Sequence, residues 1–356
     1  MKQLVLPHIR RLRAYVPGEQ PGISGLIKLN TNENPYPPSP RVFRALKHAI
    51  DSRLRLYPDP ASLSLRKAIA SHFRCGTENV FVGNGSDEIL ALSLRAFVGE
   101  KHGVGFPAPS YSLYPVLVQI QHARPLVVEF RENFALPVEL FRRNAALTFI
   151  ANPNAPSGTS VPVRVLTRLA RRLKGVLLID EAYADFADEN AASLFKRFPN
   201  VLITRSFSKS YSLAGMRVGF ALGGRPLIEA LFKVKDSYNV DRLAQAAAEA
   251  AFRDQRYLRK TVKRIRRTRE RLSTTLRKRG WEVLPSSANF VFACPPGVPA
   301  ARVFHRLRRK KVLVRYFPGK KTGRYLRISV GTDKEIDFLL KALHSLGVRG
   351  QGAKGH

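Results

Sequence analysis

The chain is poor in cysteine, which limits what its thiols can do. The only two cysteines, Cys75 and Cys294, lie far apart and give no metal-ligand spacing. We predict that both are buried thiols in a protein of the reducing cytoplasm.

Long apolar runs are also absent, and none approaches the roughly 18–20 residues that span a bilayer. The first residues, MKQLVLPHIRR, are basic, but their apolar stretch is short and ends at Pro7, so we expect no signal peptide. With 44% hydrophobic and 24% charged residues, the composition is that of a soluble globular protein. A length of 356 residues favours two domains.

Acidic residues are scarce, at 26 against 61 lysines and arginines, which gives a formal charge of +35. Such charge can attract nucleic acid or an anionic membrane, but no nucleic-acid-binding fingerprint accompanies it. The densest basic run, Arg253 to Arg279, predicts an amphipathic helix with a charged outer face. Its apolar residues recur at steps of three, four or seven: Leu258, Val262, Ile265, Leu272 and Leu276. We therefore expect a solvated surface and no specific nucleic-acid partner; a nucleic-acid-binding protein stays a distant alternative.

The chain divides into four parts. Residues 1–40 are rich in turn formers and predict an N-terminal arm that packs on something else. Residues 41–245 alternate helices with short apolar strands, which predicts an α/β domain with a mostly parallel sheet covered by helices on both faces. Residues 246–346 predict a smaller α+β domain, and the glycine-rich residues 347–356 predict a disordered tail.

Reactive residues are expected just after the strands, because open α/β sheets bind ligands at the carboxyl ends of their strands. After NVFVG, the run GNGSDE opens a helix, and Ser86 and Asp87 lie in its first turn. Glycines there let the backbone approach an anion such as phosphate, although plain helix capping is the commoner role of such a turn.

Two further strands end in polar residues. Asn152 follows LTFIA with an amide able to donate to a ring oxygen, whereas the rest of NPNAPSG reads as a simple turn. Asp180 ends VLLID, and a buried carboxylate is costly unless it meets a cation or a metal. A metal site lacks a histidine at suitable spacing, so we predict no metal and an aromatic nitrogen cation as the partner.

The fourth strand, VLITRS, leads into Ser206, Ser208 and Lys209, with Arg217 eight residues beyond the lysine. Two hydroxyls and a guanidinium make a plausible phosphate cradle with an amine in reach. A lone loop lysine is usually surface charge, but this combination favours a site.

The order Asn152, Asp180, Tyr183, Lys209, Arg217 resembles that of fold-type I pyridoxal 5′-phosphate (PLP) aminotransferases, and the closest resemblance is to the histidinol-phosphate aminotransferase family. The resemblance covers nearly the whole chain, in these motifs: LNTNENPYPPSP, LYPDP, GNGSDE, PSYSLY, NPNAPSG, IDEAYADF, TRSFSKSYSLAGMRVG, VRYF and YLRISVGT. Two departures stand out, since NPNAPSG replaces the commoner NPNNPTG and the excess of arginine is not part of the family pattern.

The resemblance implies a role for each residue. Lys209 would bind PLP covalently through its amine and then move a proton, and Asp180 would keep the pyridine nitrogen protonated. Tyr183 and Asn152 would hydrogen-bond the phenolic oxygen, and Tyr111 would stack on the ring. The cofactor phosphate would be held by the backbone of Ser86 and Asp87, by Ser206, Ser208 and Arg217, and by Tyr57 from the neighbouring subunit of a homodimer with shared active sites.

For the substrate, the resemblance points to Arg315 and Arg327, and to Tyr15 in the arm. Guanidinium forks suit phosphate and carboxylate alike, so one pocket can take histidinol phosphate and a dicarboxylate. We therefore expect transamination between histidinol phosphate and 2-oxoglutarate in histidine biosynthesis. Threonine-phosphate decarboxylase and aromatic amino-acid aminotransferase remain the alternatives, since fold does not separate them.

Overall fold

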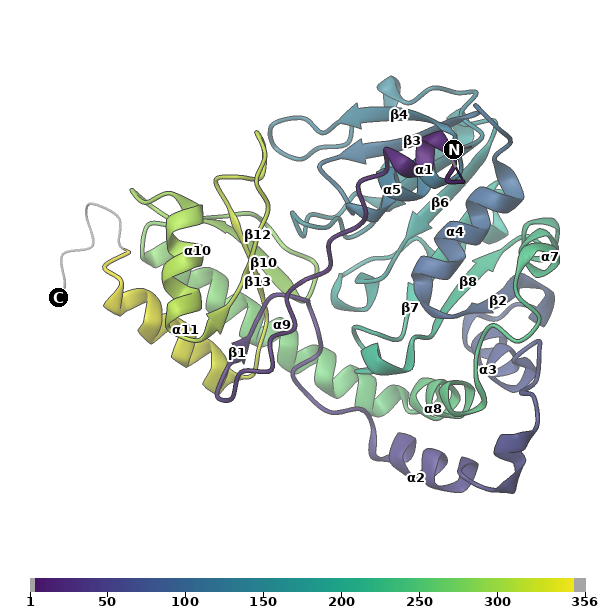
Figure 1. Ribbon diagram of the computed structural model, residues 1–356, viewed down its shortest axis with the longest axis horizontal. Coiled ribbons are helices and arrows are strands. Elements are labelled where there is room, and N and C mark those ends of the chain that lie inside the picture. The colour runs from purple at the N-terminus through teal and green to yellow at the C-terminus, as the bar shows by residue number, and fades with distance from the viewer. Residues whose placement is uncertain (1–3, 349–356) are drawn as a thin grey trace.

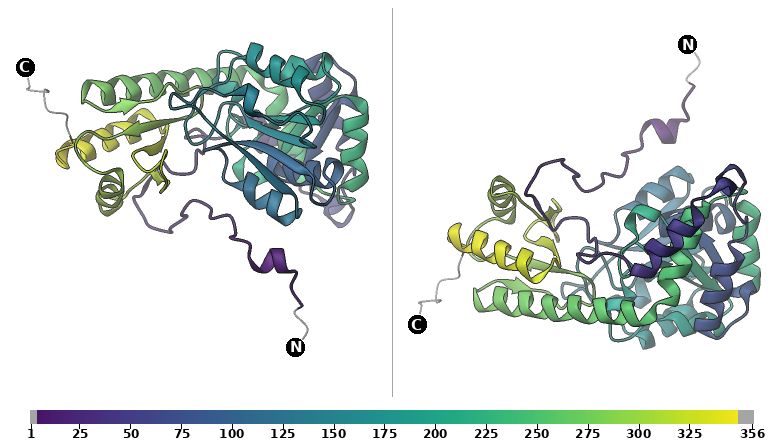
Figure 2. Two further views of the ribbon diagram at one scale, coloured as in Figure 1. Left: turned by 90° about the horizontal axis from the view of Figure 1, so that it is seen from above. Right: turned by 90° about the horizontal axis from the view of Figure 1, so that it is seen from below.

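The computed structural model describes residues 4–348, which form a larger and a smaller body joined by the long helix α9 (Gln255–Lys278) (Figure 1). The N-terminal arm runs from the larger body to the smaller one and back. Figure 2 shows, from above and from below, that its first part lies along one side of the molecule.

The larger body is built on a seven-stranded sheet. Strand β8 is antiparallel to both of its neighbours, and the other adjacent pairs run parallel. In spatial order the strands are β2 (Val80–Gly83), β8 (Gly219–Gly223), β7 (Val201–Ser206), β6 (Val176–Asp180), β5 (Leu147–Ala151), β3 (Gly103–Ala108) and β4 (Arg124–Glu129). The predicted, mostly parallel α/β sheet is confirmed.

Helices cover both faces of this sheet, because successive strand residues point to opposite sides. Ile179 packs in a core with α3 (Leu63–Phe73), α6 (Val163–Arg172) and α8 (Arg242–Arg253). Its neighbour Leu178 packs in a second core. The helices of that second core are α4 (Gly85–Phe97), α5 (Leu113–Ile120) and α7 (Arg225–Val234), while α2 (Pro40–Ala49) lies outside α8.

The smaller body holds a four-stranded antiparallel sheet with a core of its own. Its strands, in spatial order, are β12 (Arg315–Tyr316), β13 (Leu326–Ser329), β10 (Phe290–Cys294) and β9 (Glu282–Val283), and helices α10 (Ala300–Arg309) and α11 (Asp333–Ser345) pack beside them. The arm adds to this body, since β1 (Ile27–Lys28) pairs in parallel with β11 (Val312–Leu313).

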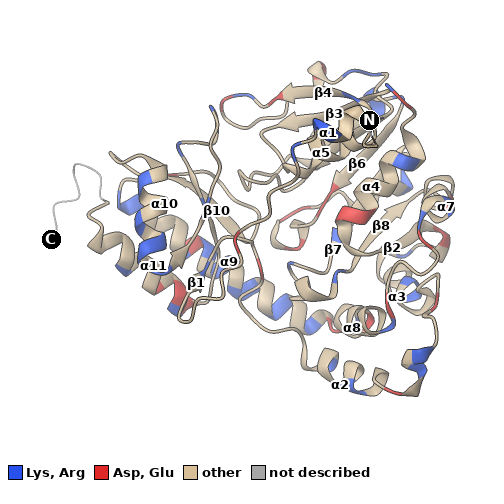
Figure 3. Cartoon of the chain, viewed as in Figure 1, with Lys and Arg blue, Asp and Glu red and all other residues tan. Residues whose placement is uncertain are grey.

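Helix α9 has the predicted apolar stripe, with Leu258, Ile265, Leu272 and Leu276 buried and Val262 partly buried. Its basic side chains lie on the other faces, and Figure 3 shows lysine and arginine spread over both bodies. No helix within residues 4–348 is long and apolar enough to cross a membrane.

The predicted boundaries fit less well than the elements. Residue 245 falls inside α8, whose alanines pack in the core of the larger body, so we propose that the boundary lies beyond Arg253. Val348 is 1% exposed and packs in the core of the smaller body, so we propose that the predicted tail begins after it and not at residue 347. Residues 349–356 of the predicted tail lie outside the described residues.

Candidate active site

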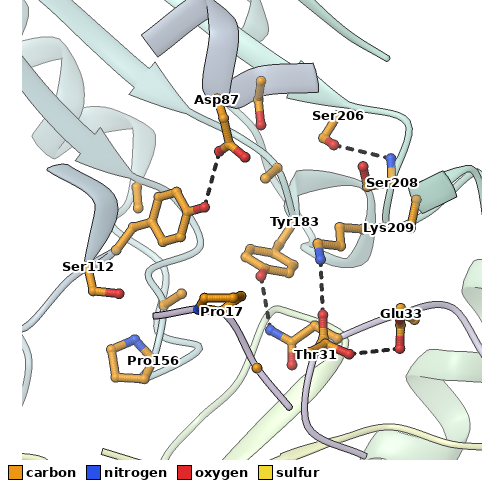
Figure 4. A pocket seen from close by; sticks show the side chains of 18 of the residues that line it. Pro17, Thr31, Glu33, Asp87, Ser112, Pro156, Tyr183, Ser206, Ser208 and Lys209 are labelled. Atoms are coloured by element: carbon orange, nitrogen blue, oxygen red, sulfur yellow. Dashed lines mark hydrogen bonds between the residues drawn. The ribbon is translucent and has the colours of Figure 1, made fainter. Parts of the chain in front are cut away.

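A cavity of about 460 Å³ opens at the carboxyl ends of β5, β6 and β7, between the two bodies and the arm (Figure 4). The structure brings together in its lining all the predicted site residues except Asn152 and Tyr57. Those present are Tyr15, Ser86, Asp87, Tyr111, Asp180, Tyr183, Ser206, Ser208, Lys209, Arg217, Arg315 and Arg327.

Asp180 is a buried carboxylate without a cation. It accepts hydrogen bonds from the Tyr114 hydroxyl at 3.0 Å, and from the Ala182 amide and the Thr204 hydroxyl at 3.3 Å each. Burial raises its pKa from 3.8 to about 6, although the Tyr114 hydrogen bond opposes the rise. No lysine or arginine of the described residues pairs with it, so a protonated ring nitrogen in the cavity would meet an unneutralised charge.

Lys209 follows β7 through a turn in which the Ser208 amide donates to the Ser206 hydroxyl at 3.1 Å. Its Nζ donates to the Thr31 carbonyl at 3.1 Å (Figure 4). The side-chain amide of Asn34 donates to the backbone carbonyl of Lys209, also at 3.1 Å. The arm therefore holds both the amine and the backbone of Lys209. Within the described part of the chain, no other lysine lines the cavity.

One end of the cavity is suited to an anion. The first turn of α4 contributes Ser86 and Asp87, and Arg217 donates to the Ser208 hydroxyl and pairs with Asp87, each at 3.4 Å. Gly85 has φ +79°, a conformation that favours glycine, and the absence of a Cβ leaves room for the Arg217 guanidinium beside it. A helix N-terminus, hydroxyls and a guanidinium together could hold a phosphate.

Tyrosines line the wall near Asp180. The Tyr111 hydroxyl donates to Asp87 at 3.1 Å, and its ring lies edge-on to that of Tyr15 at 6.0 Å. Burial and the charge of Asp87 raise the pKa of Tyr111, so its hydroxyl stays protonated. Tyr114, fully buried and stacked on Phe149, was not predicted as a site residue. Its only sequence signal is its place in PSYSLY.

Arg327 on β13 is a partly buried cation that lacks an anion. Its Nη2 donates to the Asn30 carbonyl at 3.0 Å, and its Nε has no partner. The guanidinium carbon lies 5.3 and 5.0 Å from the ring centroids of Phe290 and Phe317. Burial lowers its pKa, and no carboxylate of residues 4–348 pairs with it.

Arg315 on β12 lies in the same cavity wall and fixes the arm. It donates to the carbonyls of Val16 at 2.9 Å and Pro17 at 3.1 Å, which brings Tyr15 to the cavity. Two arginines without carboxylate partners in the described chain make this end of the cavity positive, as an anionic substrate requires.

The structure does not support the predicted role of Asn152. Its side chain bonds only to the backbone of Val161, accepting from the amide at 2.8 Å and donating to the carbonyl at 3.2 Å. These bonds close the loop between the two residues, and Ala155 of that loop lines the cavity instead. Tyr57 lies outside the cavity of its own chain, 77% exposed and stacked on Tyr238 at 4.3 Å.

Sequence reasoning missed the arm segment Asn30–Asn34, which lines the cavity through Thr31, Asn32 and Glu33. Its turn formers indicate only an extended arm. Three asparagines within NTNEN, in a stretch without periodicity, were the available signal.

Behind the cavity lies a buried ion-pair cluster of Arg205, Glu181 and Asp185. Arg205 binds Glu181 at 2.7 Å and Asp185 at 2.9 Å, and the Ser210 hydroxyl donates to Asp185 at 2.5 Å. Burial raises the pKa of Glu181, against the charge of Arg205. The cluster lies next to the site in the sequence, since Glu181 adjoins Asp180, Arg205 adjoins Ser206 and Ser210 adjoins Lys209. It therefore holds together the segments that carry Asp180, Ser206 and Lys209.

Comparison with known proteins gives a consistent result. Residues 24–343 match the family model described as aminotransferase class I and II. The chain is 46% identical over 341 residues to the histidinol-phosphate aminotransferase of Geobacter sp. (strain M21), covering 96% of this chain and 97% of the relative. It is 43% identical over 338 residues to that of Microcystis aeruginosa, covering 95% and 97%.

The solved structures include the histidinol-phosphate aminotransferase of Sinorhizobium meliloti in complex with pyridoxal-5′-phosphate. It is 28% identical, with a TM-score of 0.88, and the match covers 97% of this chain and 99% of that one. An aspartate aminotransferase of Thermus thermophilus, with a TM-score of 0.80 at 23% identity, shares the fold.

Proposed function

This chain belongs to the class I and II aminotransferases and, within them, to the histidinol-phosphate aminotransferase family, and from that premise we propose that it transfers the amino group of L-histidinol phosphate to 2-oxoglutarate. The products are imidazole-acetol phosphate and L-glutamate, and the reaction belongs to histidine biosynthesis. Threonine-phosphate decarboxylation and aromatic transamination are less favoured, because the full-length relatives compared above are named for histidinol phosphate.

The observation that carries the substrate assignment is Arg327. The Nε of this guanidinium is buried without a partner, which is costly unless an anion completes it, and the aromatic rings beside it do not supply one. A phosphate or carboxylate bound there would accept charge-assisted hydrogen bonds in the bidentate geometry that arginine favours. Arg315 adds a second positive charge to the same wall.

PLP fits the rest of the cavity. Its phosphate would occupy the cup made by the first turn of α4, Ser206, Ser208 and Arg217, and Asp180 would receive the ring nitrogen. The support is chemical: an anion cup and a carboxylate without a cation flank a lysine amine. When bound, PLP supplies an aromatic ring that withdraws electrons from the substrate.

The side chains around that ring would divide the work. Lys209 would anchor the cofactor and then move a proton at the substrate Cα, for which its amine must be neutral. The negative charge of Asp180 would keep the ring nitrogen protonated. Tyr183 would donate a hydrogen bond toward the phenolic oxygen, and Tyr111 would cover the ring.

We further propose a homodimer with shared active sites, in which Tyr57 reaches the partner's phosphate cup. Within one chain Tyr57 does not line the cavity. Apolar side chains that precede it in the sequence are exposed to an extent that a covering partner would explain: Phe43, Ile50, Leu54 and Leu56. The cytoplasm remains the proposed compartment, on the basis of the two cysteines.

The test replaces Arg327 with alanine and with lysine and follows each half-reaction separately. We expect KM for histidinol phosphate to rise about tenfold to a hundredfold in Arg327→Ala, as the loss of one charged hydrogen bond predicts. Lysine should rescue only in part, because it keeps the charge but loses the fork. Arg324→Ala is the matched control, since Arg324 lies on the surface and pairs with Glu282.

Results of two kinds would contradict the assignment, the first from the variant and the second from the wild type. One is an unchanged KM for both histidinol phosphate and glutamate in Arg327→Ala. The other is a preference of the wild type for L-phenylalanine, or CO₂ release from threonine phosphate.

A further inference from the structure

Asn32 is buried, 1% exposed, and each of its four polar groups has one hydrogen-bond partner. Its backbone amide donates to the Ser329 hydroxyl at 2.9 Å, and its backbone carbonyl accepts from the side-chain amide of Asn289 at 2.9 Å. Its side-chain oxygen accepts from the Ser329 hydroxyl at 2.8 Å, and its side-chain nitrogen donates to the Tyr183 hydroxyl at 2.9 Å. Asn32 has φ +57°, in the left-handed region that asparagine adopts more readily than most non-glycine residues.

The direction of these bonds follows from one fixed donor. A backbone N–H can only donate, so the Ser329 oxygen accepts from Asn32 and the Ser329 proton is free to be given elsewhere. It goes to the side-chain oxygen of Asn32, which sets the orientation of that amide. The NH₂ group therefore faces Tyr183, whose oxygen must accept.

A phenol that accepts from Asn32 keeps its own proton for another partner. No acceptor for that proton exists within residues 4–348, and the Tyr183 side chain lines the cavity. The hydrogen bonds between Asn32 and Ser329 orient the Asn32 side chain toward Tyr183. The Tyr183 hydroxyl is thereby left to donate to whatever occupies the cavity.

We propose that Asn32 is a positioning residue that makes Tyr183 a hydrogen-bond donor into the cavity. This rests on the function proposed above, in which Tyr183 donates to the cofactor's phenolic oxygen. Asn32 itself acts only through Tyr183. Its hydrogen-bond partners Ser329 and Asn289 belong to the smaller body. The smaller body therefore sets the direction in which the Tyr183 hydroxyl of the larger body donates its hydrogen bond.

These hydrogen-bond partners also lie close to the substrate site. Ser329 is two residues from Arg327 on β13, and Asn30, which accepts from Arg327, is two residues from Asn32. Lys209 donates to Thr31, which lies between those two asparagines. The segment therefore connects the proposed phosphate-binding arginine with both Lys209 and Tyr183.

The decisive variant is Asn32→Asp, which keeps size but replaces the donor facing Tyr183 with an acceptor. Tyr183 would then donate to the new carboxylate and no longer into the cavity. We expect Asn32→Asp to weaken PLP binding and lower kcat about tenfold to a hundredfold, as does Tyr183→Phe. The double variant should be no worse than Tyr183→Phe alone, because an effect transmitted through Tyr183 has no route once its hydroxyl is absent.

Three quantities are measured for the wild type, the two single variants and the double variant. They are the PLP dissociation constant by equilibrium dialysis, kcat, and the pH midpoint of the visible absorbance of the PLP-loaded protein. Losing a donor to the phenolic oxygen should move that midpoint upward in both single variants, which a purely structural role of Asn32 would not do. Thermal melts of the cofactor-free proteins establish folding. If Asn32→Asp does not fold, Ser329→Ala is the substitute, because it removes the hydrogen bond that orients the Asn32 side chain. Its loss of PLP affinity and kcat should be smaller, and it should disappear in the Tyr183→Phe background.

A loss that persists in full in the Tyr183→Phe background would overturn the inference, since Asn32 would then act by its charge or on the fold. So would a harmless Asn32→Asp beside a damaging Tyr183→Phe, and in both cases the proposed function would stand. A harmless Tyr183→Phe would instead remove the proposed role of Tyr183 and this inference with it.

Discussion

Asp180→Asn should make the cofactor-free protein more stable while it destroys most of the activity. The wild-type carboxylate is buried without a cation, and its pKa is raised to about 6 from 3.8. Raising a pKa by that amount corresponds to about 3 kcal/mol of free energy. Asparagine has nearly the same size and carries no charge to bury.

The sign of the pH dependence follows from the direction of the shift. The folded-state pKa of Asp180 lies above the unfolded value, so the stabilisation is fully present below pH 3.8 and is lost as the pH rises through about 6. The wild type should therefore lose up to about 3 kcal/mol of unfolding free energy across that window, and Asp180→Asn should lose none of it. At pH 8 the variant should be the more stable protein, and at pH 4 the two should be alike.

Urea denaturation of the cofactor-free proteins between pH 4 and pH 8 measures this difference. Asp188→Asn is a suitable control, because Asp188 is exposed and pairs with Arg266 at the surface, where such pairs contribute little. Turnover of the PLP-loaded Asp180→Asn protein should fall strongly, since an amide cannot hold a protonated ring nitrogen by charge. The reasoning would be refuted if the two proteins lost stability equally between pH 4 and pH 8, or if the variant were the less stable at pH 8.

Three further outcomes are expected. Lys209→Ala should abolish turnover, and mass mapping of borohydride-reduced wild type should find the pyridoxyl group on Lys209; its presence on another lysine would refute the assignment. Mixing Tyr57→Phe with Lys209→Ala subunits should restore part of the activity, because one site of each heterodimer carries neither defect, whereas an active monomer would exclude shared sites. Arg205→Met should destabilise the fold by about 3–5 kcal/mol in urea denaturation, because it leaves Glu181 buried without its cation; a loss below about 1 kcal/mol would contradict this.

The larger body could be predicted because its elements are encoded locally. Runs such as VLLID and VLITRS are short, continuously apolar and end in polar residues, as buried parallel strands do. Since ligands bind at the carboxyl ends of such strands, Asp180, Ser206 and Lys209 could be placed at one site from their positions in the sequence alone.

What could not be predicted depends on partners distant in sequence. Asn32 meets Tyr183 across 151 residues and Ser329 across 297, and no spacing rule connects such positions. Asn152 shows the reverse case, because its amide was predicted to meet a ligand, whereas in the structure its side chain bonds to the backbone of Val161, nine residues away. An asparagine at a strand end serves loop and ligand equally well, and only the folded loop decides between them.

The arm has a consequence for how the enzyme is made. Asn32 is synthesised more than two hundred residues before its partners Asn289 and Ser329. The sheet of the larger body can fold while synthesis continues, since domains fold as units and the N-terminal ones fold first. A growing chain therefore has Lys209 and Tyr183 in place before β13 exists to hold the arm against them. The cavity is complete only after β13 has left the ribosome and contacts the arm.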